Sequence, residues 1–137
     1  MASDITDELR AKVALRAHRR CEYCLIHEDD AWFAHQVDHI VSRKHGGGSD
    51  FENLAYACVV CNRNKGTDVA SVEPRTERVV RLFHPRHDRW SDHFRLDGEF
   101  IEPFTEIGQV TIRLLQINIA ERIVERRILQ QLGSYPV

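Results

Sequence analysis

The two Cys-x-x-C pairs constrain this chain more than any other feature of its sequence. They are Cys21/Cys24 and Cys58/Cys61, and they use all four cysteines of the 137 residues. Two such pairs bring four thiolates to one Zn²⁺ in a tetrahedral site. The alternatives are two disulfides, which a reducing compartment disfavours, and a thioredoxin-like redox centre, which needs only one pair. We therefore expect a structural zinc ion whose four sulfur ligands leave no open position for chemistry.

Length and composition predict a single domain over residues 1–137. The chain is 42% hydrophobic and 29% charged, with a net charge of -2, so its global charge points to no particular partner. No apolar stretch approaches the roughly 18 to 20 residues of a membrane span, and the first residues lack the pattern of a secretion signal. We therefore expect no membrane association and a cytoplasmic location, whereas the oligomeric state stays open.

The first half of the chain alternates between regular elements and polar connections. Thr6 can cap a helix that runs to about residue 20, and the β-branched alternation of 33–41 predicts a strand. Three consecutive glycines in 42–52 require a loop. The apolar segment 54–60 favours a second strand, and residues 61–66 a short helix closed by Gly66.

The second half carries weaker signals. We expect a short strand in 78–83, a hairpin over 94–104 with Asp97-Gly98 at its turn, and helices over 105–117 and 118–132. The last helix would be capped by Asn118 and would carry its apolar residues at Ile119, Ile123, Ile128 and Leu132.

A set of polar residues lies between and beside the cysteine pairs. Asp38-His39 comes first, Asn53 follows, and Asn62 stands directly after the second pair. With the four cysteines, this order resembles the HNH endonuclease family over residues 21–66, and residues 82–94 are similar to the segment that follows this core in one bacterial branch. The resemblance implies an α+β fold, with a zinc-stapled ββα-metal core at about 21–66. An N-terminal helix and a C-terminal hairpin and helical extension, at about 67–137, would surround it.

The chemistry of these residues agrees with the resemblance. Hydrolysis of a phosphodiester needs a water made nucleophilic and a cation at the phosphoryl oxygens. His39 can accept the proton of the water, because imidazole titrates near neutral pH. Asp38 and Asn62 offer hard oxygen ligands for Mg²⁺ or Mn²⁺. By resemblance, Asn53 ties the loop down through backbone hydrogen bonds and orients His39.

Asn62 is a departure, since many family members have histidine there. An amide oxygen can still bind a metal, and it shifts the expected preference toward hard ions such as Mg²⁺ or Mn²⁺.

Basic residues lie close to this segment. Arg63 and Lys65 flank Asn62, and Arg43 and Lys44 enter the glycine loop, so we expect the four to contact phosphates.

Histidines outside this set receive structural interpretations. His35 is more readily a satisfied structural histidine, and His45 a phosphate contact or a residue without a role. His84, His87 and His93 lack the spacing of a recognised metal motif.

The sequence therefore predicts a metal-dependent endonuclease that hydrolyses double-stranded DNA. A zinc-stapled nucleic-acid-binding module without activity and a nuclease acting on RNA are the alternatives. No aromatic platform for single strands is evident in the sequence, which argues mildly against single-strand recognition.

Overall fold

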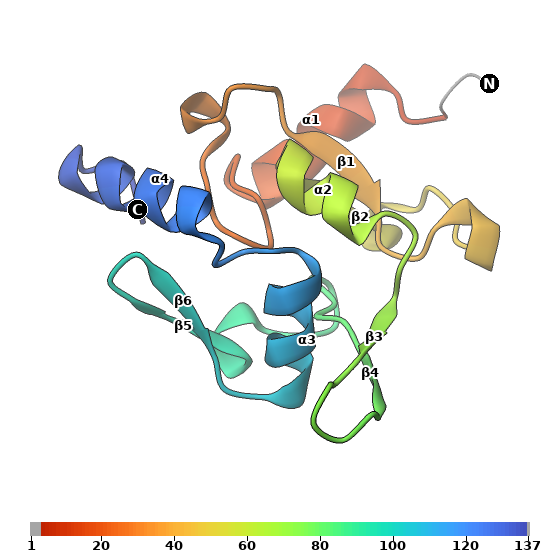
Figure 1. Cartoon of the computed structure of the whole chain (residues 1–137). Coiled ribbons are helices and arrows are strands. Elements are labelled where there is room, and N and C mark those ends of the chain that lie inside the picture. Colours follow the sequence, from red (N-terminus) through yellow and green to blue (C-terminus); the bar gives the residue numbers. More distant parts are fainter. Residues whose placement is uncertain (1–3, 137) are drawn as a thin grey trace.

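The computed structural model describes residues 4–136 and shows helices combined with small antiparallel strand pairs (Figure 1). The helices of this part of the chain are α1 (Asp7–Arg16), α2 (Val59–Lys65), α3 (Glu106–Leu114) and α4 (Ala120–Gln131). Its strands are β1 (Gln36–His39), β2 (Leu54–Ala57), β3 (Ala70–Val72), β4 (Val79–Arg81), β5 (Phe94–Asp97) and β6 (Phe100–Pro103). They pair as β1-β2, β3-β4 and β5-β6. The α+β class expected from the sequence is confirmed.

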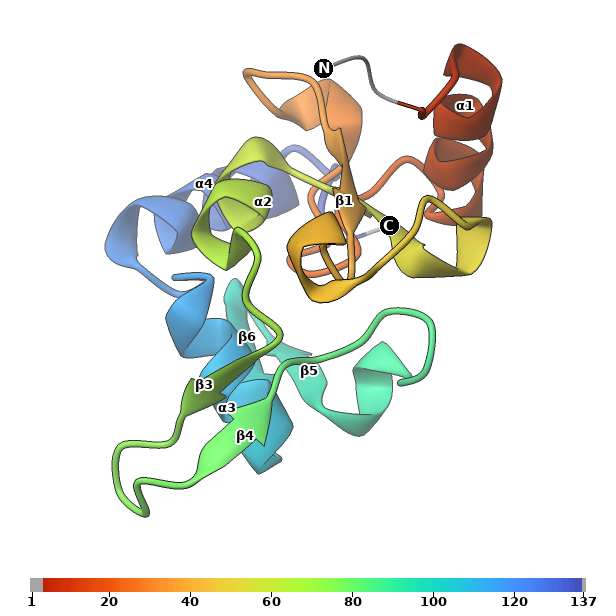
Figure 2. The same cartoon turned by 90° about the vertical axis from the view of Figure 1, so that its right-hand side faces the viewer.

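The centre of the fold is a β1-β2 hairpin followed by α2. His39 pairs with Leu54 and Asp38 with Ala55, so the loop that joins the strands runs from residue 40 to 53. α1 and α2 lie on opposite sides of this hairpin (Figures 1 and 2). On the α1 side, Val13, Leu54 and Tyr56 form a buried apolar cluster. Both faces of the hairpin are therefore covered, and its side chains have fixed surroundings.

The C-terminal extension packs onto the cysteine-containing segment. One buried cluster joins the four cysteines to apolar side chains of the extension, among them Phe83, Phe94, Ile101, Leu115 and Ile117. The β5-β6 hairpin turns at Gly98, whose φ of +60° is a conformation that favours glycine. The extension thus shares its hydrophobic core with the predicted zinc segment.

Two element boundaries differ from the prediction. α1 is capped by Thr6, whose side chain accepts from the Leu9 amide, but it ends at Arg16, because His18 and Arg19 adopt positive φ values. β2 stops at Ala57, and Cys58 caps α2 by accepting the Cys61 amide. The apolar run had suggested a longer strand. The cysteine cap begins the helix instead.

The last helix differs more. Ile119, not Asn118, is the residue that caps α4, because the Asn118 amide group bonds to the backbone N–H and carbonyl of Ile101. The core side of α4 carries Arg122 and Arg126, while Ile128 and Leu132 are 50% and 71% exposed. The predicted apolar face was therefore wrong, because buried guanidinium groups take its place and bond to backbone carbonyls.

Candidate metal centre and active site

The four cysteines converge as the sequence predicts. Their ligand atoms all lie within 4.8 Å of one another, and all four side chains are buried and free of disulfides. The Sγ atoms of Cys24 and Cys58 are 3.7 Å apart. Tetrahedral coordination with Zn–S bonds of about 2.3 Å requires sulfurs roughly 3.8 Å apart, so the cluster suggests zinc.

Each half of this cluster is shaped by its own backbone. The Cys24 amide approaches Cys21 Sγ at 3.5 Å, and the Cys61 amide approaches Cys58 Sγ at 3.4 Å. Backbone N–H groups in such positions are the usual partners of metal-bound sulfur, whereas burial without an ion raises the pKa of Cys21. Four sulfur donors complete a tetrahedral coordination shell. A zinc ion here would therefore stabilise the fold and have no open position for water or substrate.

Arg122 is a residue of this centre that sequence reasoning missed. Its Nη2 lies 3.1 Å from Cys61 Sγ and 3.7 Å from Cys58 Sγ, and its Nη1 donates to the carbonyl of Leu115 at 2.9 Å. Burial alone would lower the pKa of Arg122, but the negative charge of the cysteine cluster raises it above its usual range. The one available sequence signal is the pair of arginines four residues apart, Arg122 and Arg126, a pattern that fits a solvated helix face equally well.

His39 is the last residue of β1, at the point where the strand gives way to the loop. It is half-buried, and its Nε2 lies 2.9 Å from Ser49 Oγ. Ser49 closes the glycine run and was not singled out from the sequence.

Asn53 holds the two ends of the loop together. Its Oδ1 accepts the Val41 amide at 3.0 Å, and its Nδ2 donates to the carbonyls of Val41 at 2.9 Å and Gly48 at 2.7 Å. The fit is close, since a Cβ at Gly47 would lie 1.7 Å from the Val41 carbonyl oxygen. Backbone tethering by Asn53 is therefore visible in the structure, whereas its effect on His39 stays a prediction.

Asp38 is buried, with 5% of its surface exposed. Its carboxylate faces Lys65 Nζ at 3.2 Å and the Tyr23 hydroxyl at 3.2 Å. Burial raises the pKa of Asp38, and the positive charge of Lys65 offsets part of that effect. The proposed metal ligand thus already has a cation beside it.

The structure places Lys65 differently from the prediction. It is 2% exposed, and its ammonium also donates to the carbonyls of His39 and Ile40 at 3.2 Å each. A phosphate at the surface is out of its reach in this arrangement. No sequence signal revealed this, because a lysine one turn beyond Asn62 has the pattern of an exposed helical residue.

Asn62, like Lys65, contacts a side chain of β1. Its Nδ2 donates to the side chain of Gln36, two residues before Asp38. α2 therefore meets β1 through two polar pairs, Asn62 with Gln36 and Lys65 with Asp38. Within residues 4–136, the cysteine cluster is the one place where three or more His, Cys, Asp or Glu side chains converge. The hard oxygens of Asp38 and Asn62 suit Mg²⁺ or Mn²⁺ in chemistry, and most of the ion's shell would come from water and substrate.

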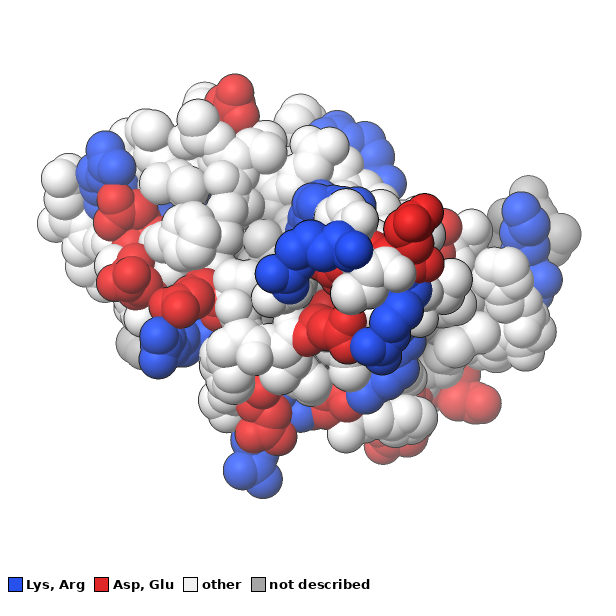
Figure 3. Space-filling view, turned by 60° about the horizontal axis from the view of Figure 1, so that its bottom comes forward, with Lys and Arg blue, Asp and Glu red and all other residues white. Residues whose placement is uncertain are grey.

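The remaining basic candidates are exposed. Lys44 and Arg63 lie at the surface, and Arg43 pairs with Asp4. Figure 3 shows Lys and Arg interspersed with Asp and Glu on one face of the molecule. The arginines of the β3-β4 region pair in the same way: Arg75 with Glu73, Arg78 with Glu106 and Arg81 with Asp88.

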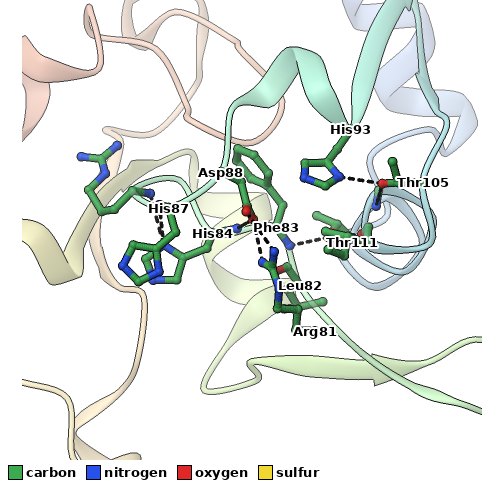
Figure 4. Close-up of polar contacts among 12 residues, drawn as sticks. Arg81, Leu82, Phe83, His84, His87, Asp88, His93, Thr105 and Thr111 are labelled. Carbon is green, nitrogen blue, oxygen red and sulfur yellow. Dashed lines mark hydrogen bonds and ion pairs between the residues drawn. The ribbon is translucent and has the colours of Figure 1, made fainter.

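The histidines of residues 84–93 have partners within the protein (Figure 4). His84 Nδ1 accepts the amide of His87 at 3.2 Å, and the two rings stack with centroids 3.9 Å apart. Asp88 receives two hydrogen bonds from Arg81, at 2.7 and 2.9 Å. His93 Nδ1 lies 2.6 Å from Thr105 Oγ1. These contacts join the β4-β5 connection to its neighbours.

Comparison with known proteins gives one match. Residues 21–68 match the family model described as HNH endonuclease. No curated protein and no solved structure matches the chain. The matched segment contains both cysteine pairs, the β1-β2 hairpin with its loop, and α2. Over residues 21–68, the chain is therefore similar to the HNH endonucleases.

Proposed function

We propose that the protein is a metal-dependent endonuclease that hydrolyses phosphodiester bonds of double-stranded DNA. The family of residues 21–68 supports a nuclease-type function with a nucleic-acid substrate. The observation that carries the proposal is the position of His39 at the end of β1, next to Asp38 and directly before a loop tethered by Asn53. A base used in hydrolysis needs such a fixed position beside a metal carboxylate.

Each residue has one role in this proposal. His39 accepts the proton of the attacking water, Asp38 and Asn62 supply oxygen ligands from β1 and α2, and Asn53 holds the loop. A divalent ion bound there would neutralise charge on the phosphoryl oxygens and the leaving group. Arg63, exposed on the same helix as Asn62, contacts a backbone phosphate. Zinc at the four cysteines stabilises the fold and takes no part in the reaction.

Two observations favour the alternatives enough to include them in the test. The Asp38–Lys65 pair satisfies the proposed metal ligand internally, as a binding module without activity would allow. Trp32 and Phe33 are 94% and 69% exposed, so an aromatic surface that the sequence did not suggest is available for unpaired bases.

The test is cleavage of plasmid DNA and of a matched RNA by the zinc-loaded protein, with and without Mg²⁺ or Mn²⁺. We expect metal-dependent cutting of DNA and a loss of roughly 10²- to 10⁴-fold in His39→Ala, as for removal of a general base. His87→Ala is the control, because that exposed histidine stacks on His84. Binding of DNA without cutting under every metal condition would favour the non-catalytic module, and cutting of RNA alone would favour the ribonuclease.

A further inference from the structure

The imidazole of His39 has one hydrogen-bond partner in the described chain. Its Nε2 lies 2.9 Å from Ser49 Oγ, and Nδ1 makes no hydrogen bond to residues 4–136. A neutral imidazole carries its proton on one nitrogen and accepts at the other. The direction of the contact with Ser49 therefore decides which nitrogen can accept a proton from water.

The surroundings of Ser49 fix that direction. Its hydroxyl donates to Asp4 Oδ1 at 2.7 Å, and the Ser49 oxygen itself accepts from Arg43 Nη2 at 2.9 Å. Hydrogen bonds from Arg43 and Ser49 lower the pKa of Asp4 to about 2, so this carboxylate is ionised at neutral pH and can only accept. A hydroxyl has a single proton, and here Asp4 receives it. Ser49 can then only accept from His39, which requires a proton on Nε2.

The position of Ser49 is itself fixed by the loop. Asn53 donates to the Gly48 carbonyl at 2.7 Å, directly before Ser49, and also bonds to both backbone groups of Val41. Gly47 lies so close to the Val41 carbonyl that no other residue fits there. These contacts form a continuous connection from Asn53 through the glycine run to Ser49 and then to the imidazole.

We propose that Ser49 is a positioning residue for His39, which it holds through Nε2–H so that Nδ1 is the atom that accepts the proton of the attacking water. Asn53 acts on His39 through Ser49 rather than by direct contact. The assignment of the bonded nitrogen follows from the hydrogen-bond network alone, and the role of Nδ1 in the reaction rests on the proposed function.

The first test needs no catalytic activity. Long-range ¹H–¹⁵N NMR spectra of the zinc-loaded, full-length protein, recorded at a pH where the ring is neutral, identify the protonated nitrogen of His39. We expect Nε2–H in the parent and in Ser49→Thr, which keeps the hydroxyl, and a mixture of tautomers in Ser49→Ala. Asp4→Ala frees the hydroxyl proton and should move His39 toward Nδ1–H. A parent with Nδ1–H, or a Ser49→Ala variant with the parent's tautomer, would overturn the inference.

The second test separates this proposal from the proposed function. Ser49→Ala should lower kcat roughly 10- to 100-fold with KM nearly unchanged, because the base is misplaced while substrate contacts remain. Ser49→Thr should restore the rate, and Ser71→Ala on β3 is the matched control. Parent activity in Ser49→Ala would remove Ser49 from the reaction. A parent protein that cuts no nucleic acid would reject the proposed function, while the NMR result would still decide how Ser49 holds His39.

Discussion

Lys65 lies beneath the end of β1, where it joins the Asp38 carboxylate to the carbonyls of His39 and Ile40. Both members of this ion pair are almost fully buried. Removal of one partner leaves an uncompensated charge in the interior, which typically costs about 3 to 5 kcal/mol. The pair therefore holds the strand end on which His39 is placed.

Lys65→Met should accordingly lower the free energy of unfolding by several kcal/mol, about 3 or more. Lys44→Met is the control, because an exposed lysine usually contributes within about 0.5 kcal/mol. Urea denaturation of the zinc-loaded variants measures both. If Lys65→Met kept the parent's stability and only flattened the salt dependence of DNA binding, Lys65 would be the phosphate contact that the sequence suggested.

Asn62 should determine which divalent ion supports cleavage. With a carboxylate and an amide oxygen as protein ligands, Mg²⁺ or Mn²⁺ should be preferred, and Asn62→His should shift the preference toward Ni²⁺ or Zn²⁺. Plasmid cleavage across these ions measures the shift. Full activity of the parent with added Zn²⁺, and none with Mg²⁺ or Mn²⁺, would contradict the assignment of Asn62 as an oxygen ligand.

Among the elements, α4 has the least expected role. It is outside the segment that matches the HNH family, yet it places Arg122 against two of the cysteine sulfurs. Four thiolates around one Zn²⁺ leave a net charge of about -2. A buried guanidinium beside them offsets part of that charge and ties α4 to the start of α2.

Arg122→Met should therefore speed the release of zinc to a chromogenic chelator, by roughly 10- to 100-fold if it behaves as metal-supporting residues generally do. Arg122→Lys should be intermediate, because it keeps the charge and loses the second hydrogen-bonding nitrogen. Arg127→Met is the matched control on the same helix, since the Arg127 side chain is 54% exposed and pairs with Glu99. Equal release rates in all four proteins would show that Arg122 does not support the metal.

Elements with a strong local signal were predictable, and those that depend on tertiary contacts were not. Thr6 predicted the start of α1. The cysteine pairs predicted the zinc segment, and the polar set from Asp38 to Asn62 predicted the core that contains the hairpin. β3 was missed, because it has one β-branched residue in its three, whereas β4, of the same length, has two. The core face of α4 was wrong, because pattern rules place arginine at the surface. Ser49 was missed for a similar reason, since its contact with His39 depends on a loop closed by Asn53.

At the scale of the whole molecule, the zinc segment and the extension meet at several buried points. The Trp90 indole donates to the Tyr23 carbonyl at 3.0 Å, and the Tyr135 hydroxyl donates to the Cys24 carbonyl at 2.9 Å. Both acceptors lie in the segment of the first cysteine pair, and the cysteines belong to the extension's own hydrophobic cluster. No described helix is long and apolar enough to cross a membrane. The contacts of Trp90 and Tyr135 couple the extension to the segment that carries the first cysteine pair.

Removal of zinc should therefore unfold the core and the extension together. The chain offers a reporter, because its two tryptophans differ: Trp32 is 94% exposed, while Trp90 packs against Phe94 at a centroid distance of 5.1 Å. In a Trp32→Phe variant, all tryptophan emission comes from Trp90, far along the chain from every cysteine. Chelation should shift that emission to longer wavelength in step with the loss of helical circular dichroism, since metal binding and folding are coupled.

Cys58→Ser should show the shifted emission without chelator, and Ser71→Ala in the same background should not. If Trp90 kept its emission after zinc had left, the extension would fold independently of the metal, and the shared core would not couple them.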